Sequence, residues 1–333
     1  MACRFLTGSY AGTSQKAICL FSFSPAAGFF METGWTGFLN PSYIIKHPTL
    51  PIFYCVEETA PLGRIHAVLI AGTRAEILDT VSSGGADPCH LSLSGDAKRL
   101  YASNYTDGSL SFFHIDDQGR IISPAFSVRH TGHGADPVRQ EQAHVHFSMD
   151  TGSSLFVCDL GLDTIFLYSI FGTQLRTFDR IRMPPGSGPR HLASSGKCLY
   201  CISELNCRVY VLIQTAGTWK IAQVIPLLHG NQHRNCTGAA IHIAEKGDLL
   251  FVSTRGNNSL AVFQIFSDGS LSDPVLSPCI PLPRDFLISD HYVIVGSQSE
   301  SLISAYSLDP VTLRLTETGY TASVDSPVCF CRL

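Results

Sequence analysis

Long hydrophobic runs and clusters of basic residues are both absent from this sequence of 333 residues. No stretch approaches the ~18 continuous apolar residues that a membrane-spanning helix needs, so we expect no membrane span. No run of Lys or Arg marks a nucleic-acid or membrane-surface patch. The net charge of −4 gives no reason to expect a nucleic-acid partner, which would favour a basic surface. These absences argue against nucleic acid and membrane as partners.

A secretory signal is also missing, because the N-terminus has no apolar stretch of the roughly 7–15 residues that a signal peptide carries before its cleavage site. Twelve cysteines are present, and Cys55, Cys158 and Cys201 lie inside apolar, strand-like runs. That placement favours buried free thiols over disulfides in a reducing compartment. We therefore expect a cytoplasmic protein.

Helical periodicity is not sustained anywhere in the chain, and charged residues amount to only 15%. Alternating apolar and polar residues, with β-branched and aromatic enrichment, predict short strands instead. One strand ending in a small polar or acidic residue recurs seven times, and the last residues of successive copies are 48, 47, 55, 44, 51 and 43 positions apart. The copies are 5–9, 54–57, 101–104, 156–159, 200–203, 251–254 and 294–297.

Each repeat has room for four short strands, which is typical of a β-propeller blade. The first repeat lacks its own leading strand, and residues 326–333 at the C-terminus fit that missing strand. The sequence thus predicts an all-β, seven-bladed propeller with four antiparallel strands per blade and a ring closed by the C-terminal strand. No linker interrupts the pattern, so 1–333 is expected to be one domain. The longest insertion, at about 130–143, is polar.

Ionisable residues recur in phase with this repeat. In a propeller blade the first strand starts, and the second ends, at the same end of the channel, so residues at these two points should meet around one mouth. The first-strand starts include Asp87, His144, Arg190, Arg284 and Asp285, and the second-strand ends include Glu58, Tyr105, Glu204, Arg255 and Gln298.

His144 and His146 are two positions apart, so on a regular strand they share a face at a separation of ~6.6 Å. They could be a structural pair between blades or, given the His-x-His spacing, metal ligands. Arginines on the same rim would repel a cation, so we expect no metal. Arg190, Arg255 and Arg284 either pair with Glu204 and Asp285 as a scaffold or bind a carboxylate or phosphate bidentately. The second interpretation is favoured. A Gly-x-Ser-x-Gly nucleophile elbow is absent.

The sequence resembles the seven-bladed lactonase family that includes the propeller-type 6-phosphogluconolactonases and the carboxymuconate-lactonising enzymes. The matching segments run through the whole chain: Gly8-Ser9-Tyr10, Asn40-Pro41-Ser42, Asp87-Pro88-Cys89-His90, Arg139-Gln140-Glu141, His144-Val145-His146, Cys158-Asp159-Leu160-Gly161, Gly188-Pro189-Arg190-His191, Ser203-Glu204-Leu205, Ser253-Thr254-Arg255-Gly256, Pro283-Arg284-Asp285-Phe286 and Ser326-Pro327-Val328.

The resemblance implies a cytoplasmic enzyme without a required metal or other cofactor. The family's proposed site falls here on His144 or His146, Arg190, Glu204 and Arg255. The family pattern has Asn where this chain has Ser203 and Glu57, and an acidic residue where it has Ala240. These departures bear on the substrate contacts rather than on the fold.

Hydrolysis of 6-phosphogluconolactone to 6-phosphogluconate in the pentose phosphate pathway is the function that this resemblance favours. We expect His146, with His144 as the alternative, to be the general base and Arg190 to stabilise the oxyanion. Glu204 would orient an arginine or the base, and Arg255 and Arg284 would hold the substrate's phosphate or carboxylate. The other expected substrate-binding residues are Asp285, His191, His90 and Glu58. A carboxymuconate-type cycloisomerase or lyase, and a propeller that only binds a ligand or protein, remain as alternatives. A ring closed by its own terminus predicts a monomer.

Overall fold

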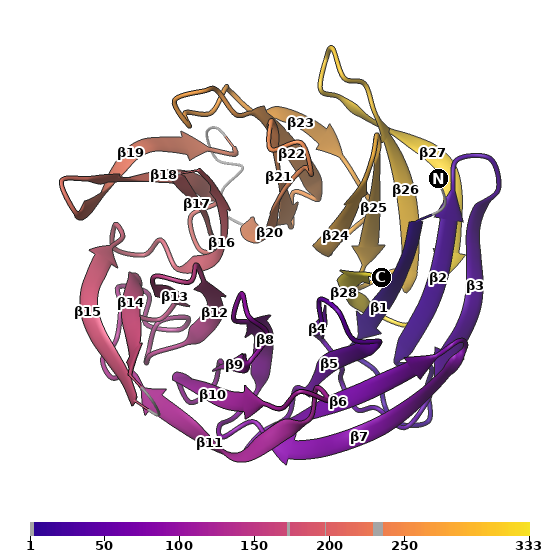
Figure 1. Ribbon diagram of the computed structural model, residues 1–333. Helices are drawn as coiled ribbons and strands as arrows, with labels where there is room; N and C mark the ends of the chain where they lie inside the picture. Colours follow the sequence, from indigo (N-terminus) through magenta and orange to yellow (C-terminus); the bar gives the residue numbers. More distant parts are fainter. Residues whose placement is uncertain (1–2, 172–173, 197, 229–235) are drawn as a thin grey trace.

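The computed structural model describes residues 3–171, 174–196, 198–228 and 236–333. These residues form seven four-stranded antiparallel sheets arranged in a ring around a central channel (Figure 1), and no helix occurs among them. The predicted seven-bladed propeller is confirmed.

Each sheet presents one strand to the channel. These inner strands are β28 (Pro327–Arg332), β4 (Ile44–Lys46), β8 (Pro88–Leu93), β12 (Val145–Asp150), β16 (Pro189–Ser195), β20 (Thr237–Ile243) and β24 (Pro283–Ser289). Four of the seven begin with proline. A first position suits proline because no ladder hydrogen bond is needed from its nitrogen.

Outward from the channel, the second strands are almost completely buried, and the third strands are buried mainly in their central residues. The second strands are β1 (Cys3–Ser9), β5 (Ile52–Glu57), β9 (Arg99–Asn104), β13 (Leu155–Asp159), β17 (Cys198–Ser203), β21 (Leu249–Arg255) and β25 (Tyr292–Ser297). The third strands are β2 (Ile18–Ser24), β6 (Arg64–Ala71), β10 (Ser109–Ile115), β14 (Thr164–Phe171), β18 (Arg208–Thr215), β22 (Ser259–Gln264) and β26 (Leu302–Leu308). Both faces of these strands meet other sheets, which explains why they read as nearly continuous apolar runs.

The outermost strands face solvent and alternate exposed with half-buried residues, as β19 does. They are β3 (Gly28–Trp35), β7 (Arg74–Ser82), β11 (Ile121–Arg129), β15 (Gln174–Arg182), β19 (Thr218–Pro226), β23 (Val275–Pro278) and β27 (Leu315–Ser323). The core is divided into seven clusters, each drawn from two neighbouring sheets of the described chain. Packing between blades, rather than one central core, therefore holds the ring together.

The ring closes as predicted. β28 pairs with β1 in a sheet of order β28-β1-β2-β3, so the first and last strands of the chain lie side by side in one blade (Figure 1). Phe5 pairs with Arg332, and the amide of Leu333 donates to the carbonyl of Arg4 at 3.0 Å. This pairing covers the inner edge of β1, which would otherwise stay unpaired.

Candidate active site at one mouth of the channel

The inner strands share an irregularity at the mouth where they begin. In six of them the register with the second strand shifts within the first few residues, so that one or two residues are left out of the ladder. The residues displaced in this way are Cys89, His146, Arg190, Ala239 with Ala240, Arg284 with Asp285, and Val328. Such β-bulges re-aim side chains and are frequent next to active sites. Four of the predicted site residues, His146, Arg190, Arg284 and Asp285, occupy these positions.

A buried carboxylate stands at the centre of the mouth. Glu204 follows β17. Its Oε2 accepts a hydrogen bond from Arg190 Nε and forms an ion pair with Arg255 Nη2, both at 3.0 Å. Its Oε1 accepts from Arg139 Nη2. Burial by itself would raise the pKa of Glu204, but the charges of Arg255 and Arg190 outweigh it and hold that pKa well below its usual range. Glu204 is therefore an anion at neutral pH that gathers three guanidinium groups.

Arg190 lies below the rim, with 3% of its side chain exposed. Its Nη1 donates to the carbonyl of Ala239 at 2.6 Å, in addition to the bond from Nε to Glu204. Burial, followed by the charges of Arg255 and Arg284, lowers the pKa of Arg190 to about 10. It remains a cation at neutral pH, and its Nη2 has no protein acceptor among the described residues.

Three histidines form an uncharged layer beside this cluster. The rings of His146 and His191 are 5.2 Å apart and those of His90 and His191 5.6 Å apart, with Phe147 and Tyr43 packed against them. Burial, together with the charge of Arg190, lowers the pKa of all three histidines well below the ordinary value. All three rings are therefore neutral at pH 7.

Hydrogen bonding separates the two candidate bases. His144 Nδ1 lies 3.0 Å from the carbonyl oxygen of Tyr105, its Nε2 is 3.3 Å from Glu141, and its ring stacks on Tyr105 at 4.3 Å. His146, by contrast, has a buried Nδ1 without any hydrogen-bond partner in the described chain. Both rings contact Tyr105, although the bulge at His146 breaks the regular alternation that the sequence predicted.

A second carboxyl group occupies the opposite side of the mouth. Glu58 accepts hydrogen bonds from the hydroxyl of Tyr10, at 2.9 and 3.0 Å to its two oxygens, and from the hydroxyl of Ser42. Burial raises the pKa of Glu58 despite the nearby charge of Arg284. The Arg284 guanidinium lies over the Tyr10 ring at 5.2 Å and makes no hydrogen bond or ion pair within the part of the chain that the structure describes.

Within the residues that the structure describes, Asp285 does not pair with an arginine, although one interpretation of the sequence expected it to. Its Oδ1 is 2.8 Å from His242 Nε2, and its Oδ2 accepts a hydrogen bond from the amide of Phe330 at 3.0 Å. It thereby ties β24 to the closing strand β28. Arg190 and Arg255 do pair with Glu204. The same three side chains therefore join neighbouring blades and line the candidate site.

Arg139 was not singled out as a site residue from the sequence, although its segment carried part of the resemblance. It comes from the insertion between β11 and β12, and 39% of its side chain is exposed. The distance between Arg139 and Glu204 along the chain hides their contact. The one sequence feature that pointed to Arg139 is the long polar insertion between two blades. Such an insertion either crosses the channel mouth or extends into solvent. Tyr10, whose hydroxyl donates to Glu58, was likewise not named as a site residue, although its segment carried part of the resemblance.

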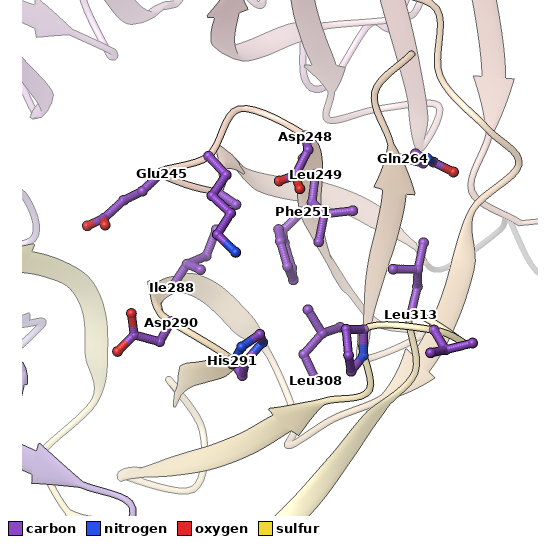
Figure 2. Close-up of a pocket in the computed structure, with 14 residues that line it drawn as sticks. Glu245, Asp248, Leu249, Phe251, Gln264, Ile288, Asp290, His291, Leu308 and Leu313 are labelled. Carbon is purple, nitrogen blue, oxygen red and sulfur yellow. The ribbon is translucent and has the colours of Figure 1, made fainter. Parts of the chain in front are cut away.

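Another hollow lies between the blade of β20 and the blade of β24, near the residues where these two strands end (Figure 2). This pocket of about 340 Å³ is formed by the turns that follow β20, β24 and β26. Its charged lining includes Glu245, Asp248 and Asp290 against Lys246. A mostly acidic lining is unsuited to an anionic ligand, whereas the mouth around Glu204 carries four arginines.

No group of three or more His, Cys, Asp or Glu side chains in the described chain could hold a metal ion. Within those residues there is also no helix long and apolar enough to cross a membrane.

A propeller whose channel mouth combines guanidinium groups, a buried carboxylate and neutral histidines belongs to the class of small-molecule-binding β-propellers. Comparison with known proteins narrows the class. The family model described as lactonase, 7-bladed beta-propeller matches residues 4–331. The chain therefore belongs to this lactonase family.

Named relatives agree with this membership. The 6-phosphogluconolactonase of Bacillus subtilis is 29% identical over 302 residues, which cover 87% of this chain and 86% of the relative. That of Formosa agariphila is 31% identical over 297 residues, covering 83% and 84%. Among solved structures, the periplasmic gluconolactonase of Pseudomonas aeruginosa superposes with a TM-score of 0.92 at 25% identity, covering 100% of this chain and 99% of the other.

Proposed function

We propose that this protein hydrolyses the ester bond of a sugar-acid δ-lactone, and specifically converts 6-phosphogluconolactone to 6-phosphogluconate in the pentose phosphate pathway. Family membership and the names of the Bacillus and Formosa relatives support a lactone substrate. The observation that carries the proposal is a set of unpartnered polar groups at the mouth. Arg284 has no acceptor in the described chain, and the buried Arg255 Nε and His146 Nδ1 have no hydrogen-bond partner.

Unpartnered buried donors and acceptors are costly, so a site that keeps several of them together is shaped for a ligand that completes their hydrogen bonds. Two of these groups are guanidiniums, which match the paired oxygens of a phosphate or carboxylate. The third is a neutral imidazole. Anion binding and proton acceptance are therefore available at one place.

The reaction that these groups support is attack by water on the lactone carbonyl. His146 would take a proton from the water as a general base, and the negative charge of Glu204, which acts on His146 against its burial, would stabilise the imidazolium as it forms. The free Nη2 of Arg190 would stabilise the oxyanion of the tetrahedral intermediate. When the ring C–O bond breaks, the proton passes from His146 to the leaving oxygen, which gives the open-chain acid.

Substrate choice would rest on Arg284 and Arg255. Arg284 lies beside Tyr10, and its guanidinium makes no hydrogen bond within the described chain, so it is available to one ligand anion. We propose that it holds the phosphate, while Arg255, with 15% of its side chain exposed, contacts the lactone end. His191, His90 and Glu58 would shape the walls, and Asp285 would act through the position of its neighbour Arg284.

We propose further that the protein acts as a monomer with a single domain over 1–333, because the ring is closed by its own C-terminal strand. A cytoplasmic location is proposed because all twelve cysteines are free and eleven of them buried, as expected in a reducing compartment.

The test is a coupled dehydrogenase assay on freshly prepared 6-phosphogluconolactone, corrected for spontaneous hydrolysis. Wild type should exceed the background rate, Arg190→Ala should approach it, and Arg284→Ala should raise KM by roughly 10–100-fold, because it removes a charge-assisted bidentate contact. Arg74→Ala is the matched control, since Arg74 is an exposed arginine on the outer strand β7, and its activity should equal wild type. A folded wild type that does not exceed background would refute the proposed substrate.

Glucono-δ-lactone without the phosphate separates two kinds of lactonase. If Arg284 binds the phosphate, Arg284→Ala should leave kcat/KM for the unphosphorylated lactone nearly unchanged. Equal losses on both lactones would show instead that Arg284 acts on the lactone ring or on the fold of the site.

A further inference from the structure

Two cysteines meet directly behind Glu204. Cys207 lies in the turn between β17 and β18, three residues after Glu204, and Cys236 immediately precedes β20. Their Sγ atoms are 2.6 Å apart, and both side chains are buried in the cluster between the two sheets. A disulfide bond requires a separation of roughly 2.05 Å, so only a small movement separates this pair from a bond.

The surroundings of the pair prepare one sulfur for attack. The hydrogen bond from Cys207 lowers the pKa of the Cys236 thiol, and the backbone amide of Asn257, the hydroxyl of Thr254 and the charge of Arg255 act in the same direction. In every other cysteine of the described chain for which a shift is resolved, the pKa is raised, in most cases mainly by burial. Because the thiolate is the reactive form, Cys236 is the cysteine best suited to oxidation.

A bond at this point would cross the junction on which the arginine cluster rests. The amide of Gly238 donates to the carbonyl of Glu204 at 3.0 Å. The carbonyls of Gly238 and Ala239 in turn accept from Arg255 and Arg190. Cys207 and Cys236 thus flank a backbone contact that joins the Glu204 segment to the start of β20.

We propose that Cys207 and Cys236 are a redox modification site, and that a small peroxide converts them into a reversible disulfide that fastens the Glu204 turn to β20. The Cys236 thiolate attacks one oxygen of hydrogen peroxide and releases hydroxide, which leaves Cys236 as the sulfenic acid. The sulfur of Cys207 then attacks that of Cys236, and a second hydroxide leaves. With the two thiol protons, the balance is two thiols and one peroxide to one disulfide and two waters.

The proposal is tested on the full wild-type chain with one equivalent of hydrogen peroxide, followed by alkylation of the remaining thiols in denaturant and tryptic mass spectrometry. Two of the twelve thiols should be lost. Peptide 198–208 should be linked to peptide 235–246, and dithiothreitol should reverse the link. The first peptide also contains Cys198 and Cys201, so Cys198→Ser is the matched control that should keep the link, whereas Cys207→Ser should abolish it.

Thermal unfolding supplies a second, independent readout. A bond that closes a native contact removes freedom from the unfolded chain, so the oxidised protein should melt roughly 5 °C higher than the reduced one. Either of two results would overturn the proposal: no link between these peptides in wild type, or a link that persists in Cys207→Ser. A linked protein with an unchanged or lower melting temperature would overturn the claim that the bond fits the native junction.

Discussion

At the scale of single residues, His146 and His144 show that two histidines close together in the sequence can differ in their hydrogen bonding and therefore in their chemistry. His144 has both ring nitrogens engaged, by Tyr105 and Glu141, whereas the Nδ1 of His146 is buried without a partner. A general base needs a nitrogen that is free to accept a proton from the water it activates. The structure therefore favours the proposed assignment of His146.

His146→Ala should lower kcat on the lactone by ~10²–10⁴-fold, the typical contribution of a general base. His144→Ala should lower it by less than about tenfold, because that ring mainly positions Tyr105 and its own strand. Steady-state kinetics above the background of spontaneous hydrolysis measures both. A drop of less than tenfold in His146→Ala would reject the base assignment, and a larger effect in His144→Ala would transfer the role.

Glu204→Gln should destabilise the protein by about 3–5 kcal/mol, because it leaves buried guanidinium groups without their carboxylate. Glu32→Gln is the matched control. Glu32 also binds an arginine, Arg4, through two bonds of 2.8 and 2.7 Å, but at the surface, so its loss should cost less than ~1 kcal/mol. Urea unfolding measures the free energy of unfolding of both variants. Equal losses would show that Glu204 does not hold the arginine cluster together.

Residue types at the mouth were predictable because a repeat brings equivalent positions to one place. Arg190, Glu204 and Arg255 meet as the phase of the repeat predicted. Arg139 and the partner of Asp285 were not predictable, since neither belongs to the repeat. Arg139 comes from an insertion. The local bulge at Arg284 and Asp285 sets the direction of the Asp285 side chain, which contacts His242 and not Arg284.

At the scale of elements, the insertion between β11 and β12 is an ordered loop that delivers Arg139. Gln140 holds it from inside: its Oε1 accepts from the amides of Ala135 and Asp136, and its Nε2 donates to the carbonyl of Leu160. His130 anchors the loop's beginning through a 2.6 Å contact with Asp159.

Gln140→Ala should lower kcat/KM by roughly 10–100-fold, because loosening the loop displaces Arg139 by a fraction of an ångström or more from Glu204. Gln142→Ala, two residues further on, is the matched control. Gln142 is exposed and makes a single side-chain bond, to the carbonyl of Thr106, so its activity should change by less than about threefold. If both variants behave alike, the loop does not act through the position of Arg139.

Strands were the most predictable elements, because β-branched and aromatic residues alternate between turn residues in every repeat. The bulges at the inner strand starts were not predictable, since an extra residue leaves the sequence pattern almost intact. Only the pairing with the second strand reveals it, as at His146 between Val145 and Phe147.

At the scale of the whole molecule, the buried histidines set a pH dependence of stability. His90, His146 and His191 have a pKa far below the value near 6.5 that they regain on unfolding. Below that value the unfolded chain binds protons that the folded protein does not. The stability contributed by the neutral rings is therefore complete above about pH 6.5 and is lost as the pH falls toward the folded pKa.

Between pH 7.5 and pH 5.5, urea unfolding should show a loss of about 1.4 kcal/mol in total for each such histidine, because the free energy of unfolding falls mainly below pH 6.5. His90→Phe keeps a ring between Tyr43 and Phe147 and removes one titrating group. Its stability should depend on pH less steeply than that of wild type by one histidine's share. A slope identical to wild type would show that His90 is protonated in the folded protein.

The architecture of the whole ring followed from the sequence because each blade repeats one pattern, and the missing first strand pointed to the C-terminal strand as its substitute. The repeat does not indicate which polar side chains of different blades contact one another across the channel. Those contacts depend on the length and direction of each side chain and not only on its position in the repeat.

The displaced residues at the inner strand starts have a consequence for evolution. Because Cys89, His146, Arg190, Ala239, Ala240, Arg284, Asp285 and Val328 stand outside the ladder pairing, replacing one of them leaves the strand pairing of its blade in place. At these positions around the mouth, the side chain can therefore change while the hydrogen-bonded pairing of the strands stays the same. Ala239, Ala240 and Val328 hold three of these positions with buried apolar side chains, and Ala240 packs in the core between two blades. A larger side chain at any of the three must displace its neighbours before it reaches a substrate.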